Sequence, residues 1–309
     1  MSHRFSNVAL TLTLAMALCL SASPAFAQED DAPAINSGSV SLSLGFDVTT
    51  QYMFRGIFQE DQGLVIQPWG EVGFNLHEAD SGITSVDLTI GIWNSFHSGP
   101  SGNGAGAGGV HGPGAWYEAD LYAGVGLTFS DVVEVSVTYV SLSSPDPAGN
   151  MFAEEILLGV ALDDSASWGD GFDGLQPYIM FAFEIDGASD GVGNGGDVYF
   201  EFGIEPSFAV LQSETTPVTL SVPVTVGLSL DDYYEFDQDG DGDTDDDTLG
   251  YIDVGFVLGM PAWFIPSDYG DWSMALGVHL IFLGDATEAG NSATDDSEII
   301  GTFGLSMEY

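Results

Sequence analysis

The chain has 309 residues, of which 47 are Asp or Glu and two are Lys or Arg, so its formal net charge is −45. Such a negative field repels nucleic acid and attracts cations, which argues against a nucleic-acid-binding function. The same acidity is also typical of proteins from saline habitats, where acidic surfaces aid solubility, and both explanations stay open.

The first 27 residues have the pattern of a secretory signal peptide. Arg4 precedes an apolar run at 8–20, and a small-x-small cleavage site follows at 25–27. Cleavage there removes the single cysteine, Cys19, which excludes disulfides, thiol catalysis and cysteine-ligated metals from the mature chain. Cleavage also leaves Arg55 as the sole base against 47 acids, for a formal charge of −46.

The rest of the chain predicts an all-β fold, an antiparallel transmembrane β-barrel of about twelve strands at 38–309, after a polar periplasmic tail at 28–37. Apolar and polar residues alternate with the period of two that a strand requires. Each segment reaches the ~9–11 residues that a strand needs to cross a bilayer. The expected strands are 38–54, 63–77, 83–97, 115–129, 132–142, 151–162, 175–186, 197–210, 217–230, 248–264, 271–284 and 298–309.

The connections also favour a barrel. Those after odd-numbered strands are mostly long and rich in Gly or Asp, and those after even-numbered strands are mostly shorter, apart from 163–174. An even-stranded barrel with both ends in the periplasm produces this asymmetry. A soluble β-sandwich or β-helix is the alternative, but twelve long strands with continuous apolar stripes would leave a sandwich too few polar outer residues.

The final strand supports the same location. Phe303, Leu305, Met307 and Tyr309 fall on one face, and the chain stops on the aromatic residue. The last strand of an outer-membrane barrel must close against the first. We therefore expect a protein of the bacterial outer membrane that contacts lipid and is recognised by the barrel assembly machinery through this strand.

Alternation turns a set of acids toward the lumen. Arg55 is expected to end the first strand pointing inward, with Tyr52 and Phe54 pointing to lipid. A guanidinium among carboxylates forms bidentate, charge-assisted pairs, so Arg55 is either an internal clamp or a constriction residue. Rings of acids favour cations in channels, although they would also hydrate a plugged barrel. The predicted lumen residues are Arg55, Asp47, Glu71, Asp87, Glu118, Asp120, Glu201 and Glu205, with further inward acids at Glu134, Glu155, Glu184 and Asp253.

The segment 43–59 resembles the N-terminal signature of the TorF-like outer-membrane proteins, in which an early strand ends in Tyr-x-Phe-Arg-Gly and a Gln follows. The family usually has Ser and Asp before the Tyr, where this chain has Thr50 and Gln51. The resemblance implies an outer-membrane barrel and brings no catalytic residues. The matching positions are Tyr52, Phe54, Arg55, Gly56 and Gln59.

An aspartate-rich segment at 237–247 matches the opening of a calcium loop, D-x-D-x-D-G, in which alternate oxygens surround a hard cation. Position 248 is Thr and not the closing Glu of an EF-hand, so the segment resembles a single calcium-binding aspartate repeat. A solvated acidic loop without an ion is the alternative. The predicted ligands are Asp237, Asp239, Asp241, Asp243 and Asp245.

Function is less sharply defined than fold. No Gly-x-Ser-x-Gly, Walker or His-Glu-x-x-His pattern is present, so we do not expect an enzyme. The sequence favours a narrow, cation-favouring, porin-like channel for cations or small solutes. The alternative is a closed structural or surface-interaction barrel whose acidic loops bind calcium or a partner.

Overall fold

A computed structural model of the protein describes residues 38–101, 115–145, 151–169, 171–192, 195–213, 216–237, 244–291 and 296–309. The predicted signal peptide at 1–27 and the periplasmic tail at 28–37 lie outside these ranges. Within these ranges, no helix has both the length and the apolar character needed to cross a membrane.

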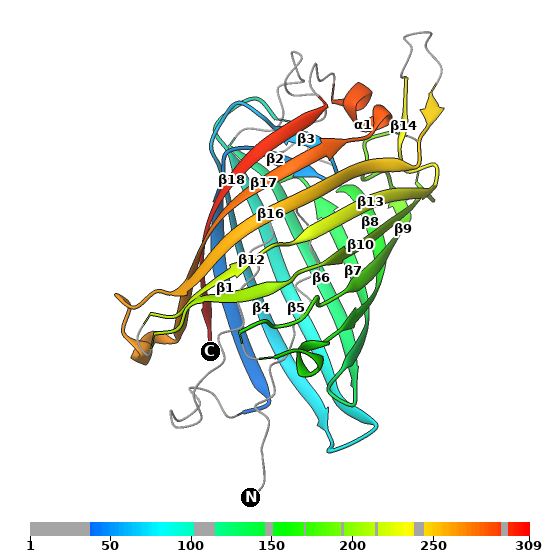
Figure 1. The fold of residues 1–309 in the computed structure, drawn as a ribbon. Coiled ribbons are helices and arrows are strands. Elements are labelled where there is room, and N and C mark those ends of the chain that lie inside the picture. Colours follow the sequence, from blue (N-terminus) through cyan, green and yellow to red (C-terminus); the bar gives the residue numbers. More distant parts are fainter. Residues whose placement is uncertain are drawn as a thin grey trace, which may run out of the picture.

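The described chain forms a closed antiparallel barrel of twelve wall strands (Figure 1). The ring closes where the first wall strand pairs with the last, from Ser43 opposite Glu308 to Thr49 opposite Thr302. The predicted fold is thereby confirmed. The wall strands in ring order are β1 (Val40–Thr49), β4 (Val65–Glu78), β5 (Ile83–His97), β6 (Trp116–Phe129), β7 (Val133–Ser143), β8 (Met151–Leu162), β9 (Tyr178–Gly187), β10 (Val198–Ile204) continued by β11 (Ser207–Leu211), β12 (Val218–Ser221) continued by β13 (Val224–Asp231), β16 (Leu249–Pro261), β17 (Asp271–Leu283) and β18 (Ser297–Glu308).

Two wall strands are interrupted by proline. Pro206 separates β10 from β11, and Pro223 separates β12 from β13. Proline has no N–H to give to the ladder, so a regular strand breaks at that residue. The two prolines still accept hydrogen bonds through their carbonyls, from the N–H groups of Val222 and Gly255 at 2.9 and 2.8 Å. The wall therefore stays continuous across both breaks.

The two faces of the wall differ in chemistry, as the alternation predicts. Apolar side chains such as Ile92, Leu121 and Val137 are 48%, 61% and 48% exposed on the outer face. Acids such as Glu71 and Glu118 point inward and are buried. A closed barrel pairs all its ladder groups internally, and an apolar outer band of this kind suits hydrocarbon.

The prediction for the end of the first strand is wrong. β1 stops at Thr49, and the residues that follow form a separate hairpin of β2 (Tyr52–Phe54) and β3 (Ile57–Glu60). The chain reverses at Arg55 and Gly56, whose φ angles of 49° and 84° match the two-residue turn that favours tight hairpins. Tyr52 and Phe54 consequently lie buried inside the barrel and do not face lipid.

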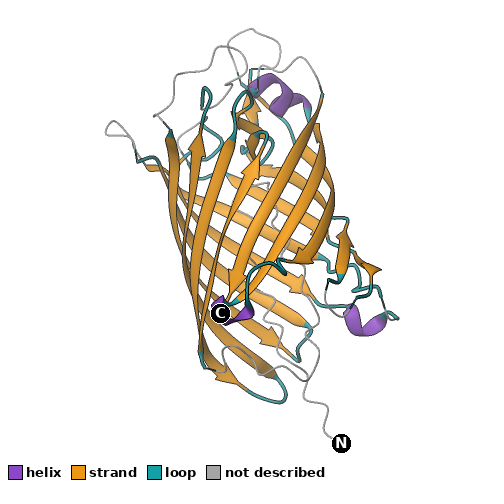
Figure 2. Ribbon diagram, turned by 90° about the vertical axis from the view of Figure 1, so that its left-hand side faces the viewer, coloured by secondary structure: helices purple, strands orange, loops and turns teal. Residues whose placement is uncertain are grey.

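The short elements gather mainly at one end of the barrel. The hairpin β2–β3 and the helix α1 (Asp285–Gly290) lie at the end opposite the C terminus (Figures 1 and 2). A second small hairpin, β14 (Glu235–Phe236) with β15 (Asp245–Asp246), follows β13 at the same end. Two 3₁₀ turns, Ser165–Ser167 and Ser267–Tyr269, complete the described secondary structure.

Replacing Val137 by Arg tests whether the outer face contacts lipid. Val137 lies near the centre of β7, where an arginine on the lipid face costs about 2–4 kcal/mol. The matched control is Val132→Arg in the turn between β6 and β7, where the cost should be about 0–1 kcal/mol because the residue lies near an interface. Urea unfolding in phospholipid vesicles measures both, and equal costs would show that the face does not lie in hydrocarbon.

Candidate functional site

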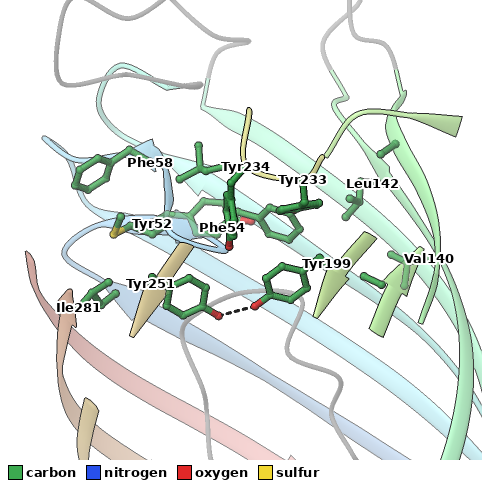
Figure 3. Packing of buried hydrophobic residues seen from close by; sticks show 14 of the residues in the cluster. Tyr52, Phe54, Phe58, Val140, Leu142, Tyr199, Tyr233, Tyr234, Tyr251 and Ile281 are labelled. Atoms are coloured by element: carbon green, nitrogen blue, oxygen red, sulfur yellow. Dashed lines mark hydrogen bonds between the residues drawn. The ribbon is translucent and has the colours of Figure 1, made fainter. Parts of the chain in front are cut away.

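The lumen is filled at one end by an inner plug, defined as the hairpin β2–β3 together with Tyr233 and Tyr234 from the connection after β13. Apart from Arg55, Gln59 and Glu60, the hairpin is apolar, and it is buried where wall side chains surround it. Tyr52, Met53 and Ile57 are fully buried. Figure 3 shows the plug aromatics against the wall residues Tyr199 and Tyr251, and these residues belong to one hydrophobic cluster.

Arg55, at the tip of the hairpin, is joined to the wall by a buried ion pair. Its Nη1 and Nη2 donate to Oε1 and Oε2 of Glu155, each at 2.7 Å. Nη1 also donates to the Tyr233 hydroxyl at 2.9 Å. Burial alone would lower the pKa of Arg55, but the Glu155 carboxylate outweighs it and holds the pKa above its ordinary value. Arg55 is therefore a charged clamp between plug and wall.

Aromatic rings surround the same guanidinium. Its central carbon lies 4.4 Å from the ring centroid of Tyr199 and 4.7 Å from that of Phe54. Such contacts stabilise a cation most when water is excluded, which is the case at this buried position. The rings therefore offset part of the cost of desolvating Arg55.

The backbone of the hairpin turn has its own partners. Asn291, which follows α1, accepts a hydrogen bond from the Phe58 N–H at 2.7 Å and donates to the Gly56 carbonyl at 2.8 Å. The Tyr234 hydroxyl donates to the Arg55 carbonyl at 2.9 Å. Buried backbone groups need such partners, so Asn291 and Tyr234 fix the position of the plug.

Glu201, on β10, receives three phenolic hydrogen bonds. Tyr199 and Tyr251 donate to its Oε2 at 2.6 and 2.9 Å, and Tyr178 donates to its Oε1 at 2.8 Å. Hydrogen bonds to a charged acceptor are stronger than neutral ones. This arrangement ties β9, β10 and β16 together beneath the plug residues Tyr233 and Tyr234. The ring of Tyr233 is tilted against that of Tyr199, and the ring of Tyr234 meets it edge-on.

A second set of wall acids meets the hairpin from β6. The Tyr52 hydroxyl donates to Glu118 Oε2 at 3.0 Å, and the neighbouring Tyr117 donates to Gln59. Asp120, on the same inner face, accepts from the Ser143 N–H at 3.0 Å. The predicted lumen residues Glu118 and Asp120 thus lie against the plug and do not line an open passage at this level.

The other predicted lumen acids are distributed along the wall. Asp47 is buried on the inner face of β1. Glu71 accepts from the Tyr122 hydroxyl at 3.1 Å, and Asp87 accepts from the Asn75 side chain at 2.9 Å. Glu205 is half-buried at the proline break between β10 and β11. None of these residues contacts Arg55, which pairs with Glu155 instead.

Sequence reasoning missed the aromatic half of the site. Alternation puts Tyr199 on the same face of its strand as the predicted lumen residue Glu201, but Tyr233 and Tyr234 lie in an acidic connection where no periodicity applies. Their signal is the tandem pair of aromatics in an otherwise acidic stretch. A further buried pair, His279 Nδ1 with Asp253 Oδ2 at 2.9 Å, joins β17 to β16 inside the barrel.

Three acids form a compact cluster beside the plug. Glu184, Asp190 and Asp197 each offer a carboxylate oxygen, and these oxygens lie within 4.8 Å of one another. Burial, reinforced by the nearby Glu184 and Asp197, raises the pKa of Asp190 to about 8. A second cluster, of Asp232, Glu235 and Asp246, meets the same distance limit but is more exposed.

The predicted calcium loop is described only at its edges. Asp237 and Asp245 are exposed at the base of the β14–β15 hairpin. The other three predicted ligands, Asp239, Asp241 and Asp243, lie outside the described residues. Calcium binding at this loop therefore stays a prediction.

Comparison with known proteins supports the fold. No family model matches the sequence, and no curated protein matches it. An outer membrane channel from Pseudomonas putida F1 is similar in structure, with a TM-score of 0.50 and 12% identity over 91% of this chain and 99% of that one. The β domain of the Bordetella autotransporter BrkA has a TM-score of 0.44 at 10% identity, covering 89% and 99% of the two chains. The KdgM porin has a TM-score of 0.40 at 6% identity, covering 87% and 99%.

The chain has the fold of a bacterial outer-membrane barrel. The wall is closed, its outer face is apolar, and the channel from Pseudomonas putida F1 has the same architecture over nearly its whole length. These features place the protein in the bacterial outer membrane, in contact with lipid.

Substituting Glu155 by Gln tests the clamp. Gln removes the negative charge and leaves Arg55 buried and uncompensated, which should destabilise the folded barrel by about 3–5 kcal/mol. The control is Glu154→Gln, which removes the same charge from the adjacent, half-buried residue. Urea unfolding in vesicles measures both variants. A loss at Glu155 no larger than that at Glu154 would contradict the clamp.

Proposed function

We propose that the protein is a narrow, cation-favouring channel of the outer membrane, for cations or small solutes, whose lumen is constricted by the inner plug. The observation that carries this proposal is the charge balance of the inner wall. Glu71, Asp87, Glu118 and Glu201 point into the barrel, and Arg55, the sole Lys or Arg downstream of the predicted cleavage site, is neutralised by Glu155. The remaining lumen field is negative.

A negative lumen enclosed by a low-dielectric wall raises the local concentration of cations and lowers that of anions. Rings of Asp and Glu select cations in channels by this means. The acids away from the plug matter most, because Glu118 accepts a hydrogen bond from the plug residue Tyr52, and Glu201 lies beneath the plug, where Tyr199 and Tyr251 donate to it. Glu71 and Asp87, on β4 and β5, are therefore the best candidates for selectivity residues.

The selectivity prediction concerns Glu71 and Asp87. In planar bilayers under a KCl gradient, the reversal potential should indicate cation preference, and the double variant Glu71→Gln/Asp87→Asn should shift it toward zero. The control variant, Glu78→Gln/Asp80→Asn, removes two acids that are exposed at the barrel end and should leave it unchanged. Anion preference of the unmodified protein would rule out this form of the proposal.

The plug prediction uses the register of the wall. Thr49 and Val65 are paired across β1 and β4, so residues 50–64 can be replaced by Asn-Gly, a two-residue hairpin turn, without changing the ring. Removing the hairpin part of the plug from the lumen should raise the single-channel conductance. Far-UV circular dichroism and heat-modifiable migration on gels check that the barrel still forms. A folded variant with unchanged conductance would show that the plug does not limit ion flow.

The alternative function is a closed structural or surface-interaction barrel whose acidic loops bind calcium or a partner. The tight packing of the plug favours it, since Tyr52, Tyr233, Tyr234 and Tyr251 are all fully buried. Absence of conductance in the unmodified protein, together with conductance in the plug-less variant, would support this alternative. Calcium binding to 237–247 would be tested by titration calorimetry of Asp239→Asn/Asp241→Asn.

Family membership is part of the proposal. The residues that resemble the TorF-like proteins, from Tyr52 to Gln59, are those of the hairpin that enters the lumen. A signature that encodes a plug would be a functional feature of the barrel, and we propose that the chain belongs with those proteins. We propose transport and not catalysis. Recognition of β18 by the barrel assembly machinery likewise stays a proposal.

A further inference from the structure

The acid cluster beside the plug spans the connection from β9 to β10. Glu184 lies near the end of β9, Asp190 lies in the connection, and Asp197 directly precedes β10. We propose that these three carboxylates bind one hard divalent cation, Ca²⁺, at the end of the barrel opposite the C terminus. The proposal concerns residues other than the aspartate loop at 237–247, and it does not require that the barrel conduct.

The spacing of the oxygens fits a single ion. Ca²⁺ holds its oxygen ligands at about 2.3–2.6 Å, so two ligands of one ion lie at most about 5 Å apart. One oxygen from each of the three residues lies within 4.8 Å of the others. The donors are all oxygens, without imidazole or thiolate, which selects a hard cation over a transition metal.

A second observation comes from Glu184, which is 4% exposed. Its Oε1 accepts hydrogen bonds from the Ser189 N–H at 2.6 Å and the Ser189 hydroxyl at 2.7 Å. Its Oε2 is buried and has no hydrogen-bond partner among the described residues. A buried carboxylate oxygen without a donor is costly, and a bound cation would supply the missing partner.

The surroundings offer no other counter-charge. The mature chain holds a single Lys or Arg, and that residue, Arg55, is already paired with Glu155. Asp190 is held in place within the described part of the connection, because the Val192 N–H donates to Asp190 Oδ1 at 2.9 Å. Three acids held this close without a nearby base favour binding of a cation from solution. Asp197 is only half-buried, so a cation can reach the cluster from its side.

The site would act on the plug through Ser189. Its hydroxyl contacts Glu184, lies 2.9 Å from the Tyr233 hydroxyl, and lies 3.4 Å from Arg55 Nη1. An ion that fixes Glu184 would also fix Ser189 and, through it, the clamp. This step rests on the proposed function, because it makes Ca²⁺ a stabiliser of the constricted lumen.

The test is isothermal titration of CaCl₂ into the full-length mature protein in detergent. Asp197→Asn, at the half-buried member, should weaken binding by at least about tenfold, because ligand charge sets calcium affinity. Asp80→Asn, exposed in the turn between β4 and β5, removes the same charge and should leave the affinity unchanged. Heat-modifiable migration confirms folding, and Glu184→Gln provides a second variant with the same expected loss.

Three results would overturn the proposal. The unmodified protein could release no calcium heat, the Asp197 and Asp80 variants could bind equally, or binding could disappear only in Asp239→Asn/Asp241→Asn, which would assign the ion to the aspartate loop. Conductance measured in CaCl₂ and in EGTA tests the link to the plug separately. If the protein binds Ca²⁺ through Asp197 but shows no conductance, the channel proposal is refuted and the calcium-site proposal is supported.

Discussion

The bidentate pair of Arg55 and Glu155 is the interaction on which the interior of this barrel depends. It joins residues 100 positions apart and fastens the tip of the hairpin β2–β3 to β8. Desolvating two charges costs several kcal/mol for each ion, so the pair is stable only with good geometry and additional partners. Tyr233 supplies a hydrogen bond, and the rings of Tyr199 and Phe54 supply further electrostatic support. The aromatic plug is therefore the environment that makes the ion pair tolerable.

The same argument explains why a hydrophobic core lies inside the lumen. The interior of a barrel widens with strand number, and at twelve strands the wall side chains alone do not have to meet. The hairpin and the tyrosines after β13 fill that space at one end. Each buried backbone group of the turn still needs a partner, which Asn291 and Tyr234 provide. The hairpin β2–β3 is thus held by Asn291 after α1, by the tyrosines after β13 and by Glu155 on β8, which are far apart in sequence.

The wall could be predicted from sequence because its signal is local. A period of two along each strand separates outer from inner residues without knowledge of the neighbours, and Ile92, Leu121 and Val137 face outward as that period requires. The same period gave the wrong orientation for Tyr52 and Phe54. The alternation continues unchanged from β1 into the hairpin, although the hairpin leaves the wall and enters the lumen. Only the positive φ angles of Arg55 and Gly56 mark the reversal. The partner of Arg55 could not be predicted from the sequence. Alternation identifies many inward acids, but it does not show which of them lies next to the guanidinium.

In the proposed channel, pore size and lumen charge would be set by different residues. The pore size would depend on the plug, whose members contact Glu118 and Glu155 near one end of the barrel. The charge elsewhere in the lumen would depend on acids such as Asp87, which pairs in register with Asn75 toward the other end of β4 and β5. Because Arg55, the sole Lys or Arg among the described residues, is paired with Glu155, the lumen charge would stay negative whether the plug is present or withdrawn. Withdrawal of the plug would therefore change the conductance of the proposed channel without reversing its preference for cations.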